Sequence, residues 1–137
     1  MFKFSKQSQE RLTTCDSRLQ FIATKALNIG LIDFTVVTGH RSKVDQMIAV
    51  QEGRSKVVWP NSKHNKTPSF AMDLAPYHNG INWNDTRPFY LLAGIILSIA
   101  NNEGIKIRWG GAWNGDLNIY RADKILMDLP HFEITGD

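Results

Sequence analysis

Two histidines and two aspartates in the sequence have the types and spacing of a hydrolytic metal site. His64 and Asp73 are nine residues apart, and His131 lies near the C-terminus. Two neutral imidazoles and a carboxylate can hold a zinc ion and leave its fourth position to water, as in catalytic zinc sites. Asp128 lies three residues before His131 and before Pro130, so it can lie beside the metal and accept a proton from that water.

The sequence around these residues also allows simpler interpretations. A histidine in a polar loop, such as His64, is ordinarily a surface residue. Asp73 lies in an apolar segment, where a buried carboxylate is costly unless it is paired or metal-bound. His131 precedes Phe132 in the last apolar segment and also needs a partner. Glu133 should share its face of the strand, where it either supports the histidine or is only an edge residue.

Arg41 is the candidate for binding negative charge. It follows the β-branched segment 34–38 and Gly39, so its guanidinium is expected at the end of a strand. There it can donate two parallel hydrogen bonds to a carboxylate or a developing oxyanion. A surface salt bridge with Asp45 or Glu52 is the alternative, and we favour contact with substrate.

Short motifs occur along the chain in a fixed order: Arg41-Ser42 with Gln46, Ser62-x-His64, Ala71-x-Asp73, and Asp128-x-Pro130-His131-Phe132-Glu133. This order resembles that of the zinc D-alanyl-D-alanine and L-alanyl-D-glutamate peptidases, a family that includes the Hedgehog signalling domain. The similarity is greatest to the small phage endolysins and extends over nearly the whole sequence. The resemblance implies one Hedgehog/DD-peptidase-like domain.

The resemblance also implies roles for individual residues. The metal ligands for Zn²⁺ would be His64, Asp73 and His131, and Asp128 would be the catalytic base. Arg41 would stabilise the oxyanion and contact substrate. Two further substrate contacts are implied, by Gln46 and Ser62.

The substrate implied by the resemblance is the peptidoglycan stem peptide. We favour cleavage of the L-alanyl-D-glutamate bond, and removal of a terminal D-alanine is the close alternative. A zinc-stabilised binding module without peptidase activity is a second alternative, but it would not need Asp128. A metal-dependent nuclease would use the basic charge of the chain, but such sites need more clustered histidines than the segment around His64 offers.

Composition places the chain among ordinary globular proteins. Its 137 residues, 42% of them hydrophobic, fit one domain over residues 1–137. The net charge of +3 gives a mild attraction to polyanions, but the basic residues are scattered, so we expect no nucleic-acid partner. The longest apolar run, 89–100, is shorter than the roughly 20 residues that a membrane span needs.

The N-terminal residues lack the apolar core of a signal peptide. Together with the resemblance to the phage endolysins, this implies a protein that stays in the host cytoplasm until lysis and then acts on the cell wall. We also expect a monomer.

Periodicity predicts an α+β fold in which helices pack on a small antiparallel sheet. Helices are expected over residues 12–27, with an interruption and a new cap at Asp16-Ser17, over 42–52, and over 89–103 with Asp85 as the cap. Segment 57–68 is expected to be a loop, and Asn79-Gly80 a two-residue hairpin turn. The expected strands are 34–38, 70–75, 105–109 and 132–135.

Overall fold

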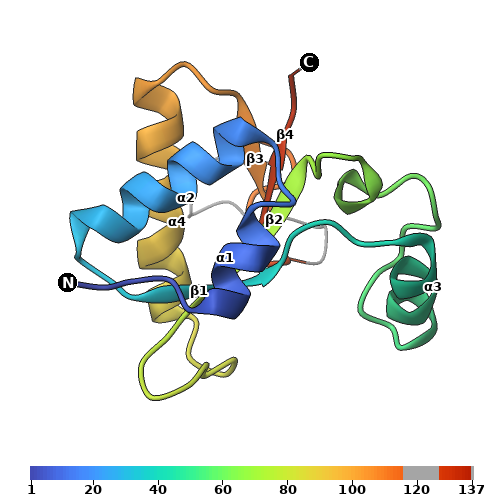
Figure 1. The fold of residues 1–137 in the computed structure, drawn as a ribbon, viewed down its shortest axis with the longest axis horizontal. Helices are drawn as coiled ribbons and strands as arrows, with labels where there is room; N and C mark the ends of the chain where they lie inside the picture. Colours follow the sequence, from blue (N-terminus) through green and yellow to red (C-terminus); the bar gives the residue numbers. More distant parts are fainter. Residues whose placement is uncertain (116–126, 137) are drawn as a thin grey trace.

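The protein is described by a computed structural model that covers residues 1–115 and 127–136. Helices and strands are mixed along this chain (Figure 1). The elements in order are α1 (Lys6–Leu12), α2 (Ser17–Ile29), β1 (Phe34–Thr38), α3 (Lys43–Gln51), the 3-10 helix η1 (Lys63–Asn65), β2 (Ala71–Pro76), α4 (Arg87–Asn102), β3 (Ile107–Trp109) and β4 (His131–Ile134).

The described strands form a four-stranded antiparallel sheet in the order β1-β2-β4-β3, which confirms the expected fold class. Strand β4 comes last in the sequence but is paired between β2 and β3. The register places Asp73 opposite His131 and Arg108 opposite Glu133. Side chains at opposite positions of an antiparallel pair lie within contact distance, so the register itself brings these residues together.

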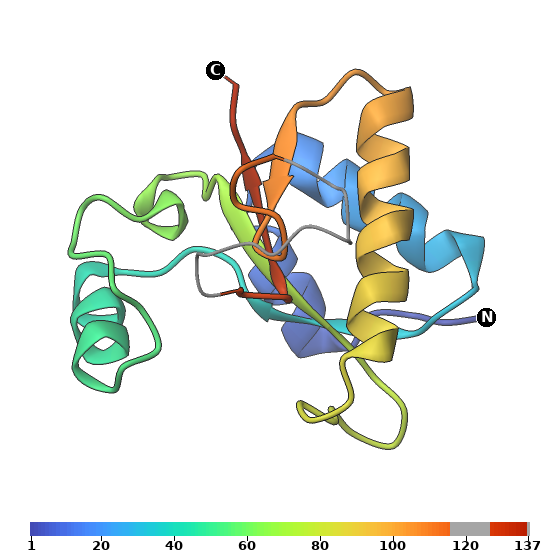
Figure 2. The same ribbon diagram turned by 180° about the vertical axis from the view of Figure 1, so that it is seen from behind.

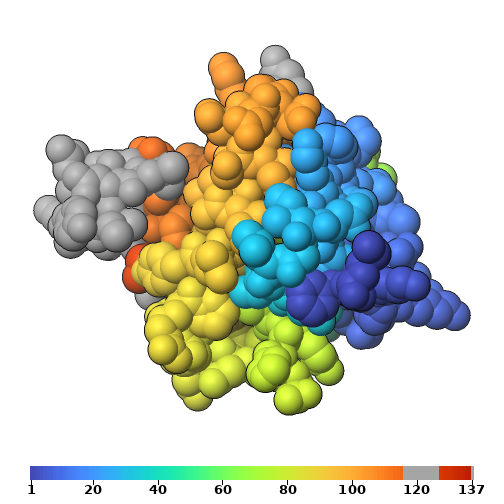
Figure 3. Space-filling model, turned by 90° about the vertical axis from the view of Figure 1, so that its left-hand side faces the viewer, coloured from blue at the N-terminus to red at the C-terminus, as the bar shows by residue number. Residues whose placement is uncertain are grey.

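Helices α2 and α4 lie side by side and form one outer face of the molecule (Figure 3). The predicted apolar stripe of α2 is buried, and it packs in one core with α4 and with Met72, Leu74, Phe132 and Ile134 of the sheet. Burial of each large aliphatic side chain contributes about 1.5–3 kcal/mol. At 16 residues, α4 is the longest helix in the described part, and no described helix combines the length and hydropathy of a bilayer-spanning segment.

Helix α3 and η1 lie on the other side of the sheet from α2 and α4, and both ribbon views show α3 standing away from the main body (Figures 1 and 2). Only Gln46 and Ala49 of α3 are buried. Ser42 caps the helix as predicted, since its hydroxyl accepts a hydrogen bond from the backbone N–H of Asp45. This part of the fold is therefore anchored by polar contacts rather than by an apolar core.

Local structure departs from the prediction in several places. The first helix, α1, ends at Leu12, where the predicted helix was expected to begin. Asn79 and Gly80 have the expected positive φ angles, but the chain continues into turns and then α4, so the predicted hairpin is wrong. A hairpin turn needs a second strand to pair, and residues 81–84 form none. The expected loop over 57–68 contains the single turn η1, which carries His64. Asp16 caps α2 as predicted. The N-cap of α4 is Thr86 and not the predicted Asp85, because the helix begins at Arg87; Asp85 accepts a hydrogen bond from the N–H of Arg87.

Candidate active site

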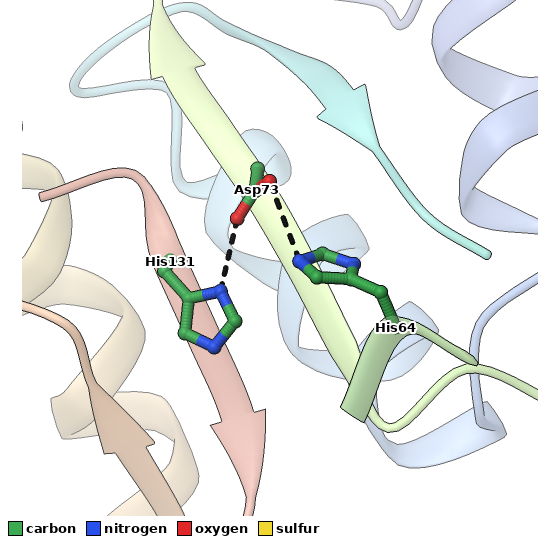
Figure 4. A group of neighbouring side chains, drawn as sticks. All are labelled: His64, Asp73 and His131. Carbon is green, nitrogen blue, oxygen red and sulfur yellow. Dashed lines mark hydrogen bonds and ion pairs between the residues drawn. The ribbon is translucent and has the colours of Figure 1, made fainter. Parts of the chain in front are cut away.

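The three predicted metal ligands come together from three elements, η1, β2 and β4 (Figure 4). His64 Nε2 lies 3.4 Å from Asp73 Oδ2, and His131 Nδ1 lies 3.1 Å from Asp73 Oδ1. One ligand atom from each residue falls within 4.8 Å of the others. All three side chains are largely shielded from solvent, with exposed fractions of 3% for His64, 14% for Asp73 and 9% for His131.

Backbone structure explains why His64 meets the sheet at this point. The Ser62 hydroxyl caps η1 by accepting a hydrogen bond from the His64 N–H, and the His64 carbonyl accepts one from the N–H of Arg41. The ring atom Nδ1 of His64 lies 2.8 Å from the carbonyl oxygen of Gly39. A side chain at position 39 would overlap the Arg11 carbonyl oxygen, so glycine allows this loop to lie close to the end of α1.

The donor set consists of two imidazole nitrogens and a carboxylate oxygen, which are groups that zinc binds. The contacts of Asp73 with His64 and His131 use different oxygens of its carboxylate. The Gly39 carbonyl can only accept, so Nδ1 of His64 carries a proton and Nε2 is free to bind a metal. His131 has the opposite arrangement, because its Nε2 faces the carboxylate of Glu133 and its Nδ1 faces Asp73.

Charges in the site are strongly coupled. Burial alone would raise the pKa of Asp73, but His64 and His131 outweigh it and hold that pKa well below its ordinary value. Burial alone would lower the pKa of His131, yet hydrogen bonds to Asp73 and Glu133 raise it to about 9. Without a metal, His131 is thus protonated at neutral pH and donates from both ring nitrogens. A metal at this position takes the place of one proton.

Glu133 supports the outer side of His131. Its Oε1 lies 2.9 Å from His131 Nε2, and its Oε2 accepts a hydrogen bond of 3.0 Å from Arg108 Nη2. The ring of Trp113 lies 5.1 Å from that of His131. Sequence reasoning considered Glu133 for this place but missed Arg108 and Trp113. The contact of Arg108 with Glu133 follows from their pairing across β3 and β4, which no local motif in the sequence indicates.

Asp128 lies at the exposed edge of the site, just before the turn into β4. Its backbone N–H donates to the carbonyl of Gly110, and its own carbonyl accepts from the N–H of His131. Loss of hydration and the negative charge of Asp73 raise the pKa of Asp128 above its ordinary value, while His131 opposes this shift. Asp128 is therefore close enough to the metal ligands to feel their charges.

Arg41 also points into the site. Its Nη2 lies 3.8 Å from Asp73 Oδ2, and 12% of its side chain is exposed. Its Nη1 donates to the side-chain oxygen of Gln46 at 3.1 Å. The salt bridges considered from the sequence, with Asp45 or Glu52, are not formed, and Glu52 pairs with Arg54 instead.

Gln46 is placed differently from the expectation that it binds substrate. It is completely buried, and its amide nitrogen donates to Ser55 Oγ and to the Val57 carbonyl. Its amide oxygen accepts from Arg41 and Asn65. With both ends of the amide occupied, Gln46 positions Arg41 and cannot itself contact a ligand without giving up these bonds.

The hydroxyl group of Ser62 can still donate a hydrogen bond. Its hydroxyl oxygen is used to cap η1, and its side chain is partly exposed. Contact between Ser62 and a substrate remains a prediction.

Three comparisons with known proteins bear on this site. Residues 1–135 match the family described as phage L-alanyl-D-glutamate peptidase. The sequence is 37% identical over 114 residues to the L-alanyl-D-glutamate peptidase of Escherichia phage T5, covering 82% of each chain. The fold is similar to the crystal structure of the Serratia marcescens L-Ala D-Glu endopeptidase ChiX, with a TM-score of 0.78, 28% identity, and coverage of 98% of this chain and 90% of that chain.

Proposed function

Because this chain belongs to the phage L-alanyl-D-glutamate peptidase family, we propose that it is a zinc-dependent endolysin that hydrolyses the L-alanyl-D-glutamate bond of peptidoglycan stem peptides. The observation that carries the zinc-dependent part is the convergence of His64, Asp73 and His131 with Asp128 at its open edge. A His-Asp-His set with one open position is typical of hydrolytic rather than structural zinc.

The proposed ligand atoms are Nε2 of His64, a carboxylate oxygen of Asp73 and Nδ1 of His131. This choice is supported by the hydrogen bonds at the other ring nitrogens, which leave these two nitrogens for the metal. Zinc bound there would polarise the scissile carbonyl and lower the pKa of a water molecule.

Asp128 is the proposed base. Its carboxylate lies within reach of the charges of Asp73 and His131, so it could accept a proton from a water molecule bound at the metal and return it later. It takes a proton from the attacking water and then delivers it to the amine of D-glutamate as the peptide bond breaks. Its exposed position leaves room for the substrate to reach it.

Arg41 is the proposed partner of the carbonyl oxygen on which negative charge develops. Its guanidinium is held at the site by Gln46 and by the charge of Asp73, so little reorganisation is needed during the reaction. Ser62, at the start of η1, is proposed to donate a hydrogen bond to the bound peptide.

Residues 1–137 are proposed to act as one catalytic domain, and the family match over residues 1–135 supports this proposal. The chain is also proposed to act as a monomer. The proposed place of action is the bacterial cell wall, after accumulation in the host cytoplasm. No nucleic-acid partner is proposed.

The test is hydrolysis by the purified protein, treated with a chelator and then reloaded with zinc. Purified peptidoglycan should yield new glutamate amino ends with zinc and none without it. Release of free D-alanine would instead identify a carboxypeptidase. If zinc-loaded protein left the peptidoglycan uncleaved, the protein would be a binding module. If it cleaved DNA and a chelator stopped this cleavage, it would be a nuclease.

A further inference from the structure

The segment that contains α3 stands away from the main body of the protein (Figure 1). We define the α3 lobe as residues 41–66, which contain α3, the following loop and η1. The lobe holds six lysines and arginines and two acidic residues, a net charge of +4. The whole chain has a net charge of +3, so the other 111 residues together carry −1. The basic character of the protein is therefore concentrated in this lobe.

Two of these lysines are available to bind a ligand. Lys43 and Lys56 are exposed, and no ion pair joins either of them to another residue of the described chain. By contrast, Arg54 is paired with Glu52, and Lys63 donates to the Ile134 carbonyl. The lobe thus presents positive charge that its own structure does not neutralise.

The same lobe also keeps apolar side chains at its surface. Five large hydrophobic residues of the lobe are exposed, namely Val44, Met47, Ile48, Val57 and Val58. The buried residues of α3 are only Ala49 and Gln46, whose side-chain amide is hydrogen-bonded. A surface with exposed apolar groups among unpaired cations is typical of a binding surface rather than of a solvated face.

The lobe is continuous with the active site. The backbone N–H of Arg41 donates to the His64 carbonyl, and Asn65 donates to both the Arg41 carbonyl and the Gln46 side chain. A chain bound across Asp73 and His131 therefore has the lobe directly beside it.

We propose that the α3 lobe is the surface that holds the uncleaved, carboxylate-bearing stem peptides of the peptidoglycan network on either side of the bond being cut. This inference rests on the proposed function. A glutamate within a peptide keeps one carboxyl group outside the main chain, so a wall of such peptides is a dense array of negative charge. The cations of the lobe complement that charge, and its apolar side chains fit the methyl groups of alanine residues.

The experiment compares two charge-reversed proteins in their full-length, zinc-loaded form. The lobe variant is Lys43→Glu with Lys56→Glu, and the matched control is Lys3→Glu with Lys106→Glu. All four lysines are exposed, and both variants change the net charge equally. Binding is measured by co-sedimentation with intact purified peptidoglycan during a brief incubation on ice, at low and high salt. Turnover of a short soluble peptide containing L-alanyl-D-glutamate is measured in parallel.

We expect the lobe variant to bind peptidoglycan about tenfold more weakly and to lose most of the salt dependence of the wild type. The control should bind within about twofold of the wild type, because its charges lie elsewhere. Both variants should turn over the short peptide normally. Failure of the wild type to cleave that peptide would overturn the proposed function, whereas the binding measurement reports on the lobe alone.

Four results would overturn the inference. Equal weakening of both variants would mean that only net charge matters. Unchanged binding by the lobe variant would place the wall contact elsewhere. If the wild type self-associated in size-exclusion chromatography and the lobe variant did not, the lobe would bind a second copy of the chain. If the lobe variant lost binding to DNA as strongly as binding to peptidoglycan, the lobe would bind polyanions in general.

Discussion

Replacement of Glu133 by glutamine isolates the contribution of its charge to metal binding. The amide oxygen can still accept a hydrogen bond from His131 Nε2, but the negative charge that faces both His131 and Arg108 is lost. A hydrogen bond to a charged group contributes about 1.5–3 kcal/mol and a neutral one about 0.5–1.5 kcal/mol. The difference of about 1 to 1.5 kcal/mol corresponds to roughly a tenfold weaker affinity for zinc.

Glu133→Ala should have a larger effect. It leaves Nε2 of His131 and the guanidinium of Arg108 without their common partner, in a site where the Glu133 side chain is 8% exposed. We expect a loss of about 10- to 100-fold in zinc affinity, the range found when the outer partner of a ligand histidine is removed.

The assay is competition for zinc with a chromophoric chelator at fixed pH. Glu103→Gln is the matched control. Glu103 is exposed, and its carboxylate pairs with Lys25, which is not a residue of the site. Activity at saturating zinc should remain within about tenfold of the wild type in Glu133→Gln. Unchanged zinc affinity in both Glu133 variants would refute the idea that this carboxylate holds His131 for the metal. If Glu133→Gln abolished activity while zinc stayed fully bound, Glu133 would be the catalytic base.

Three further predictions concern the base, the support of Arg41 and the charge of His131. Asp128→Asn should lower hydrolysis by about 10² or more with zinc still bound, and loss of zinc in proportion to activity would make Asp128 a ligand. Gln46→Ala should lower kcat about tenfold at unchanged zinc content, whereas the exposed Gln51→Ala should not; equal kcat values would refute the positioning role. Because the pKa of folded His131 is raised from 6.5 to about 9, its stabilising charge is complete below pH 6.5 and is lost as the pH rises through 9. Metal-free protein should therefore show a falling Tm between these values, and a flat Tm there would contradict that assignment.

Sequence reasoning predicted the elements with strong local signals. β1 has the predicted limits, and the caps at Asp16 and Ser42 mark real helix starts, because each depends only on residues within one turn. The prediction of a hairpin at Asn79-Gly80 was wrong because a hairpin depends on more than local residues. Its turn residues adopt positive φ, but whether a turn joins two strands depends on pairing partners elsewhere in the chain.

The site was predictable as a set of residue types and not as a geometry. The sequence indicated His64, Asp73 and His131 as ligands, but their approach depends on the insertion of β4 between β2 and β3, which is a property of the whole sheet. The same pairing creates the contact between Arg108 and Glu133. Gln46 was assigned to substrate because a motif does not reveal that a polar side chain is fully buried and saturated with hydrogen bonds.

Gly110 allows a last prediction, because it fixes the position of Asp128 without touching the metal. The Gly110 carbonyl accepts a hydrogen bond from the Asp128 N–H, and a Cβ atom at position 110 would overlap the Asp128 carbonyl oxygen. Gly110→Ala must therefore displace the backbone of Asp128. The His131 carbonyl also accepts a hydrogen bond from the Gly110 N–H, but His131 is held in addition by its pairing with β2 and by Glu133. Misplacement of a catalytic group by about 1 Å costs up to about 10²-fold in rate, so we expect kcat to fall by 10- to 100-fold at nearly wild-type zinc affinity. Gly94→Ala on α4 is the control, since a Cβ there meets nothing within 4 Å. Wild-type kcat in Gly110→Ala would mean that Asp128 acts from a position that this contact does not set, and parallel loss of zinc would mean that Gly110 supports His131 instead.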